Sequence, residues 1–255
     1  MGRSIEMCRA AGFEGDIYSV NPIHTTIGDL NCYPAIEDLP VVPDASFVGL
    51  SVERSIEAIS QLAALGASGA VVHASGFSEL GEAHHQHEVA LRDAAGSMAI
   101  LGPNTMGLIN NFDGVALWGD KNHCERVRAD GVALISQSGA FVFGITNVER
   151  AYPMGYAISV GNQVIVDFAD AIECALDDPR VRVIGLYIEG LREGQALSKA
   201  LGRALEQNIP VVLLRGGGTP EAAVASLSHT GGLAVPNDFW HALIRASSIL
   251  FSSSP

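Results

Sequence analysis

The residue best suited to covalent chemistry is His229, in the small-residue segment Ser226–Leu233, which reads Ser-Leu-Ser-His-Thr-Gly-Gly-Leu. An imidazole nitrogen can accept a group and pass it on, and glycines let a segment move and be approached closely. The pattern predicts a nucleophile that takes up a group at one place and delivers it at another. An ordinary solvent-exposed loop histidine is the alternative that this segment alone leaves open.

The turn Ser136–Gly139 is a second candidate, because it follows the apolar run Gly131–Ile135 and precedes a helix-like segment. Small residues there leave the first N–H groups of the helix accessible, with the positive end of the helix dipole behind them. The turn could therefore hold a phosphate group. Its serines could equally be ordinary helix N-caps.

Two further strand ends carry polar groups. Glu189 follows the apolar run Val181–Ile188, and its carboxylate could orient an imidazole and raise its basicity. The segment Gly102–Gly107, of sequence Gly-Pro-Asn-Thr-Met-Gly, could line a ligand. Each also has a simpler interpretation, a solvated carboxylate for Glu189 and a plain chain reversal for the turn.

A histidine cluster invites a metal interpretation. His84 and Glu88 are four residues apart on an expected helix, with His85 and His87 between them, but no cysteine or further carboxylate completes a ligand set. We therefore expect a solvated polar helix face and no metal. The four cysteines lack CxxC spacing, which is typical of a reduced cytoplasmic protein.

Strand-like and helix-like segments alternate along the chain, which indicates βαβ units and parallel sheets whose ligands bind at the carboxyl ends of the strands. Residues 110–130 are expected to be an irregular connection between domains 1–125 and 126–255. Residues 23–45 are expected to be a polar turn, a short helical piece at 35–39 and a loop, and residues 252–255 a frayed tail. The expected strands are 16–20, 45–50, 69–73, 98–101, 131–135, 156–160, 181–188 and 209–214, and the expected helices are 4–11, 55–65, 141–150, 166–176, 196–207 and one ending near 91.

The composition excludes several classes of partner. The 255 residues include 28 acidic and 15 basic ones, for a formal net charge of -13, and no Lys/Arg block. This argues against binding to nucleic acid or to an anionic membrane surface. No apolar run is long enough to cross a bilayer. The chain opens on a helix, without the strand that normally begins a doubly wound nucleotide-binding unit, so we expect upstream residues or another segment to supply that strand.

Taken together, these segments resemble the alpha subunit of succinyl-CoA synthetase, and more closely the equivalent part of ADP-forming acyl-CoA synthetases. The resemblance keeps its order and spacing over nearly the whole chain. It implies an α/β protein with an N-terminal Rossmann-like CoA-binding domain, its first strand missing, followed by a flavodoxin-like ligase domain. The matching segments are 12–22, 102–110, 134–140, 159–162, 186–190 and 225–234.

The resemblance also implies roles for individual residues. His229 matches the residue phosphorylated during turnover, and Glu189 matches the glutamate that holds it. The helix N-terminus that binds the phosphate would be Ser138, Gly139 and Ala140. The residues implied in CoA binding or at the active site beside it are Asn21, Pro22, Leu50, Ser51, Val52, Asn104 and Thr105.

The implied reaction forms acyl-CoA from a small carboxylic acid, CoA and ATP, or runs in reverse, through an acyl phosphate and phospho-His229. ATP or ADP with Mg²⁺ would come from a partner, an ATP-grasp beta-type subunit or domain, in an oligomeric assembly. A non-catalytic CoA- or acyl-CoA-binding regulatory module is the alternative. The presence of both His229 and Glu189 favours the enzyme, and the absence of a GxGxxG loop disfavours a dinucleotide-dependent dehydrogenase.

Overall fold

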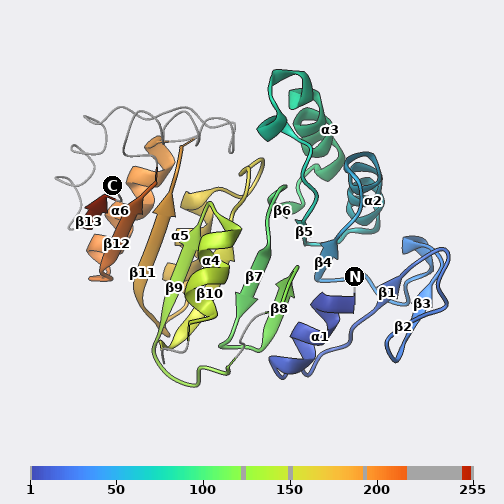
Figure 1. Cartoon of the computed structure of the whole chain (residues 1–255), viewed down its shortest axis with the longest axis horizontal. Helices are drawn as coiled ribbons and strands as arrows, with labels where there is room; N and C mark the ends of the chain where they lie inside the picture. The colour runs from blue at the N-terminus through green and yellow to red at the C-terminus, as the bar shows by residue number, and fades with distance from the viewer. Residues whose placement is uncertain (1, 122–124, 149–151, 192–193, 217–248, 254–255) are drawn as a thin grey trace.

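The computed structural model describes residues 2–121, 125–148, 152–191, 194–216 and 249–253. Within these residues the strands form one seven-stranded sheet and two three-stranded sheets, with helices packed against them (Figure 1). The α/β class and the parallel sheets predicted from the sequence are confirmed. None of the described helices is both long enough and apolar enough to span a membrane.

The seven-stranded sheet has the order β13-β12-β11-β9-β10-β7-β8. The five strands β9 to β13 run parallel to one another. β7 and β8 form an antiparallel hairpin, which joins the sheet through the antiparallel pairing of β7 with β10. Central strands covered on both faces read as continuous apolar runs, as β9 does. The bounds are β7 Gly107–Asn110, β8 Val115–Trp118, β9 Gly131–Ser136, β10 Met154–Ser159, β11 Val181–Ile188, β12 Val211–Arg215 and β13 Ile249–Ser253.

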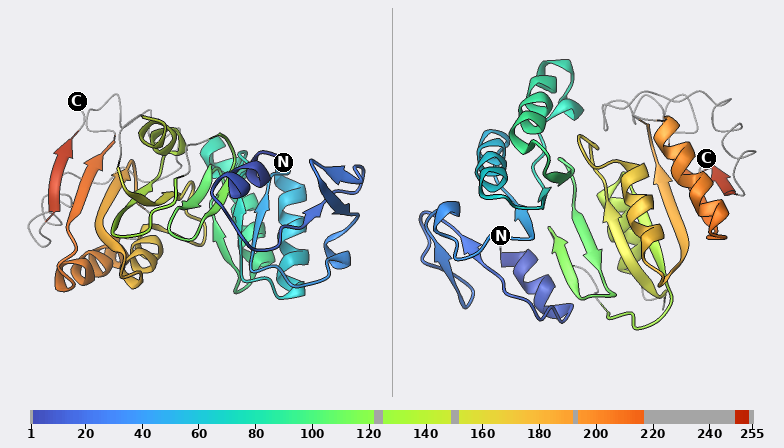
Figure 2. Two further views of the ribbon diagram at one scale, coloured as in Figure 1. Left: turned by 90° about the horizontal axis from the view of Figure 1, so that it is seen from below. Right: turned by 180° about the vertical axis from the view of Figure 1, so that it is seen from behind.

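Helices cover both faces of this sheet (Figure 2). On one face, α5 (Phe168–Asp177) and α6 (Gly194–Glu206) bury their apolar stripes against β9 and β11. On the other face, α4 (Gly139–Thr146) and α1 (Gly2–Ala10) share a core with β8 and β10. The sheet is therefore the middle layer of three.

A smaller parallel sheet has the order β4-β5-β6, with strands Ala45–Val48, Gly69–Val72 and Ala99–Leu101. It shares a separate core with α2 (Val52–Leu65) and α3 (His85–Ala95), which also pack against each other. A third sheet joins β1 (Ser19–Val20) in parallel and β2 (Thr26–Ile27) in antiparallel register to β3 (Leu30–Tyr33). Single-turn helices span Ile36–Asp38, Ser78–Leu80 and Glu82–His84.

Three expectations about irregular segments were wrong. The expected connection 110–130 contains β8, and the expected loop 23–45 contains β2 and β3. The expected frayed tail contributes to β13, which pairs in parallel with β12 and thereby satisfies backbone groups that a tail would leave to water. The division into domains 1–125 and 126–255 stays a prediction. The hairpin β7–β8 lies before residue 126, but its strand β7 pairs with β10, which lies beyond it.

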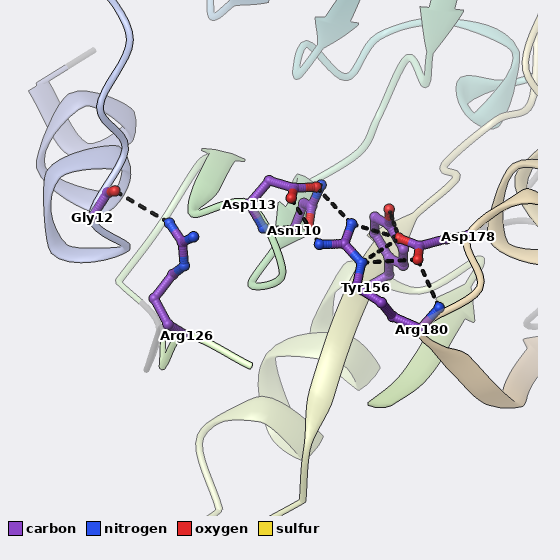
Figure 3. Close-up of polar contacts among 7 residues, drawn as sticks. All are labelled: Gly12, Asn110, Asp113, Arg126, Tyr156, Asp178 and Arg180. Carbon is purple, nitrogen blue, oxygen red and sulfur yellow. Dashed lines mark hydrogen bonds and ion pairs between the residues drawn. The ribbon is translucent and has the colours of Figure 1, made fainter. Parts of the chain in front are cut away.

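An arginine ties the β7–β8 turn to the amino ends of the parallel strands (Figure 3). The Arg180 guanidinium contacts Asp113 in that turn at 2.9 Å and Asp178 at 2.7 Å, and it lies 4.4 Å from the centre of the Phe112 ring. The Tyr156 hydroxyl donates to Asp178 at 2.7 Å. These contacts keep the pKa of Asp178 well below its usual range, chiefly through the hydrogen bonds from Arg180.

Candidate functional site

The site lies at the opposite, carboxyl end of the strands, where the turn after β6 connects the two parallel sheets. Each side of this turn is held by backbone hydrogen bonds. Asn104 N donates to the Ala74 carbonyl at 2.8 Å, and the Pro103 carbonyl accepts from Asn162 N at 2.9 Å. Gly161, at φ 59°, makes this approach possible, because a Cβ there would lie 2.3 Å from the Pro103 carbonyl oxygen.

Thr105, one of the predicted ligand-binding residues, is buried and used internally. Its hydroxyl donates to the Ser159 carbonyl and accepts from Gly107 N at 2.9 Å. The Thr105 carbonyl lies 2.6 Å from His73 Nδ1. Because a carbonyl only accepts, His73 carries a proton on Nδ1. Thr105 therefore positions the turn.

The N-terminus of α4 has the geometry of a capped helix. Ser138 Oγ accepts from Phe141 N at 3.2 Å, and Ser138 N donates to Ser136 Oγ at 3.1 Å. The backbone N–H groups of Gly139 and Ala140 have no acceptor among the residues that the structure describes. The N-cap interpretation of Ser138 is thus confirmed, and two N–H groups remain for an anion at the positive end of the helix.

Glu189 lies at the end of β11, next to the strand end that leads into α4. Gln137 Oε1 accepts from the backbone N–H groups of Glu189 and Gly190 at 3.0 and 2.9 Å, which fixes this loop to the end of β9. The Tyr187 ring stacks on Phe141 of α4 at 4.3 Å between centroids. Burial and the neighbouring Glu189 carboxylate raise the pKa of the Tyr187 hydroxyl. Tyr187 thus connects Glu189 to α4.

The implied partner of Glu189, His229, lies outside the described residues, so its position stays a prediction. The last described residue before the segment that contains His229 is Gly216, which directly follows β12. A Cβ on Gly216 would lie 3.0 Å from Glu189 Cγ. Gly216 therefore lies beside both Tyr187 and Glu189.

The residues implied in CoA binding occupy two places. Leu50 and Ser51 follow β4 and share a sheet edge with Asn104, while the Val52 side chain is buried in the α2 core. Asn21 follows β1 in the separate small sheet, where its Oδ1 accepts from Ile23 N and His24 N, each at 2.9 Å. Pro22 beside it is exposed.

The histidine cluster differs from its prediction as a solvated polar face. Glu88 has no exposed surface, because its carboxylate points inward and accepts from Ser78. His87 Nδ1 lies 3.3 Å from the Gly76 carbonyl, and His85 is exposed. Within the described part of the chain, no group of three or more His, Cys, Asp or Glu side chains could hold a metal ion.

Sequence reasoning also missed two residues at the centre of the site. Glu79 lies in the single-turn helix Ser78–Leu80 after β5 and Asn162 in the loop after β10, and Asn162 Nδ2 donates to Glu79 Oε2 at 2.6 Å. The available signal was their place just beyond strand ends, where polar groups of an α/β protein meet. His73, which had no argued partner in the sequence, follows β5 at the same edge.

Two family models cover most of the chain. Residues 3–111 match a CoA binding domain, and residues 129–254 match the succinyl-CoA ligase like flavodoxin domain. The order of the two matches is the order that the resemblance implies.

Curated relatives agree with the family models. The chain is 29% identical to acetate–CoA ligase (ADP-forming) II of Archaeoglobus fulgidus over 94% of its own length and 36% of that protein. It is 28% identical to the alpha subunit of acetate–CoA ligase (ADP-forming) II of Pyrococcus furiosus, over 94% of its length and 52% of that subunit. The chain thus spans about a third to a half of the curated relatives it matches.

A solved structure shares the fold over almost the entire chain. It is the acetyl-coenzyme A synthetase 1 of Ca. Korarchaeum cryptofilum, described as dinucleotide forming and solved in complex with phosphate and ADP. The TM-score is 0.88 at 29% identity, covering 98% of this chain and 54% of that one. The chain therefore contains a CoA binding domain followed by a succinyl-CoA ligase like flavodoxin domain, and over both domains it is similar to the alpha-type part of ADP-forming acyl-CoA synthetases.

Proposed function

We propose that this chain provides the acyl-transfer and phosphohistidine part of an ADP-forming acyl-CoA synthetase, which forms acyl-CoA, ADP and phosphate from a small carboxylic acid, CoA and ATP, or runs in reverse. One observation carries the proposal. The turn after β6 packs directly against the N-terminus of α4, since a Cβ on Gly139 would lie 2.3 Å from Met106 Cγ. A thioester at the turn and a phosphate at α4 would therefore be neighbours.

In the reverse direction, which starts from acyl-CoA and phosphate, the first step joins these two ligands. A phosphate oxygen attacks the thioester carbonyl carbon, so that the new C–O bond replaces the C–S bond. The thiolate leaves and takes up the proton that the phosphate loses, giving acyl phosphate and free CoA. The N–H groups of Gly139 and Ala140, which have no acceptor among the described residues, would stabilise the phosphate charge.

The second step transfers the phosphoryl group of the acyl phosphate to His229 and releases the carboxylate. Glu189 would orient the imidazole and stabilise its positive charge. The glycines on either side of the histidine loop would let the phosphohistidine reach a nucleotide held elsewhere. ATP or ADP and Mg²⁺ would be bound by an ATP-grasp partner subunit or domain, and domains 1–125 and 126–255 would divide the binding of CoA and phosphate.

The test starts from acetyl-CoA and inorganic phosphate, with release of free thiol as the readout. Intact mass at alkaline pH, with an acid-treated aliquot and a His229→Ala variant, detects the phosphohistidine. The proposal expects thiol release and an acid-labile phosphate adduct that the variant lacks. CoA binding without thiol release or an adduct, even with an ATP-grasp partner, ATP and magnesium added, would favour the non-catalytic CoA-binding module.

A further inference from the structure

Three polar side chains from separate loops form a connected row across the candidate site. Asn162 Nδ2 donates to Glu79 Oε2 at 2.6 Å, and Asn104 Nδ2 donates to Asn162 Oδ1 at 3.3 Å. Glu79 follows β5, Asn104 follows β6 and Asn162 follows β10. The row therefore joins the small parallel sheet to the seven-stranded sheet at the edge where ligands of α/β proteins bind.

The carboxylate of Glu79 is the nearer of two that orient the first amide, since Asn162 Nδ2 also lies 3.5 Å from Glu88 Oε1. Its Oε1 accepts from Gly76 N at 2.5 Å and from Phe77 N at 3.2 Å, while Oε2 accepts from Asn162. Since an ionised carboxylate has no proton to donate, Asn162 must present its NH₂ group to Glu79. Its Oδ1 then faces the other way, toward Asn104.

The same reasoning fixes the second amide. Because Asn162 offers an oxygen, Asn104 must offer its NH₂ group, and this turns Asn104 Oδ1 away from the row. The Asn104 backbone is held at φ 55° and by its N–H bond to Ala74, so the side chain starts from a fixed point. Asn104 Oδ1 accepts no hydrogen bond from the residues that the structure describes.

We propose that Glu79 is a positioning residue: acting through Asn162, it presents Asn104 Oδ1 as an acceptor to the thiol end of CoA. The donor would be the last amide N–H of the pantetheine arm or the thiol S–H itself. This inference rests on the proposed function, which supplies CoA as the ligand of this edge. If the two amides were reversed, Asn104 would present a donor and lose the contact.

Glu79→Gln tests the orientation with little change in shape. A glutamine has one accepting and one donating end, but the Glu79 site has donors on both sides. One N–H group must then face another, unless Asn162 and Asn104 both reverse. We expect CoA binding, measured by titration calorimetry on the full chain, to weaken about three- to tenfold. Glu57→Gln, on the exposed surface of α2, is the matched control and should bind CoA as the wild type does.

A double-mutant cycle with Asn104→Ala separates positioning from a general structural effect. If Glu79 acts through Asn104, the double variant binds CoA about as weakly as the single variant with the lower CoA affinity. Independent effects would multiply instead, and multiplication would overturn the inference, as would unchanged CoA affinity in Glu79→Gln. Should Glu79→Gln fail to fold, Asn162→Ala interrupts the row without touching Gly76 or Phe77 and must weaken binding similarly.

Desulfo-CoA, which keeps the amide and lacks the thiol, identifies the donor. Equal losses for CoA and desulfo-CoA assign the contact to the amide N–H, and a loss confined to CoA assigns it to the thiol. A wild-type chain that binds neither would contradict the proposed function and remove this inference with it. A wild-type chain that binds CoA, with multiplicative variants, would contradict this inference alone.

Discussion

Gly139 at the start of α4 lies directly against Met106 in the turn after β6. A Cβ atom on Gly139 would stand 2.3 Å from Met106 Cγ and 3.1 Å from Met106 Cβ, and 3.3 Å from Ser159 Oγ. Met106 precedes β7, whereas Gly139 follows β9. The absence of a side chain at one position therefore sets how closely the helix N-terminus approaches the turn.

Gly139→Ala should impair the acyl-transfer step more than it affects stability. The added methyl group must displace Met106 or shift α4, and either movement separates the two proposed ligands, so we expect thiol release from acetyl-CoA and phosphate to slow at least tenfold. Steady-state thiol release, beside a thermal unfolding curve, measures both effects. Gly144→Ala is the matched control in the same helix, since a Cβ there meets nothing within 4 Å. It should leave activity unchanged and stabilise the chain by about 0.5–1 kcal/mol.

A second prediction distinguishes the contribution of the Thr105 hydroxyl to stability from that of the side-chain shape. Thr105→Val keeps the shape but leaves the Ser159 carbonyl and Gly107 N without their buried partner, at a cost of about 1–3 kcal/mol. Thr105→Ser keeps the hydroxyl and should cost less, although it removes a methyl group. Urea unfolding of both variants decides the order. A valine variant as stable as the serine variant would contradict the positioning role of the hydroxyl.

Tyr187→Phe should affect phosphoryl transfer while keeping the ring stacked on Phe141. The hydroxyl lies beside the Glu189 carboxylate, so its removal frees the glutamate to turn from the orientation proposed for holding His229. Loss of a hydrogen bond to a charged group predicts about tenfold slower formation of the phosphohistidine. Quench-flow samples taken at alkaline pH and analysed by intact mass would measure it. An unchanged rate of formation would assign Tyr187 a packing role only.

Much of the fold could be predicted from the sequence because its parallel strands are short apolar runs with turn residues at both ends. β11 was predicted with its observed bounds, and β9 to within one residue. β8 was missed because it gains its stability from pairing with β7 and packing under α1, and neither can be read from its four residues. β13 was missed for the same reason: it pairs with β12, which lies far from it along the chain, and its serines read locally as a tail.

The site was predictable where chemistry follows from position along a strand. Ser138 and Glu189 follow β9 and β11, and the structure places these neighbouring strand ends together. Glu88 could not be found in this way, because a carboxylate on a polar helix reads as solvated until its burial is known. Glu88 is buried because the segment 76–88 packs over Asn162, a contact between distant parts of the chain.

Acid unfolding should depend on the carboxylate of Asp178. Hydrogen bonds from Arg180 and Tyr156 depress its pKa in the folded state, so the folded protein holds the proton less tightly than the unfolded chain. The stabilisation is then fully present above the ordinary aspartate pKa of about 3.9 and is lost as the pH falls below it. We expect the free energy of unfolding to decline more steeply between about pH 5 and pH 2 in the wild type than in Asp178→Asn.

Asp130→Asn provides the control for this pH dependence, because Asp130 also pairs with an arginine, Arg182, at 2.9 Å, but both side chains are more than half exposed. Water screens such a pair, and its removal should change stability by less than about 1 kcal/mol at any pH. Urea titrations at half-unit pH intervals compare the slopes of the three proteins. If Asp130→Asn reduced the decline of the unfolding free energy at acid pH as much as Asp178→Asn does, the general loss of a negative charge would explain the effect. A slope that changes only in Asp178→Asn would assign the acid sensitivity to the Arg180 contacts that hold the β7–β8 turn on the large sheet.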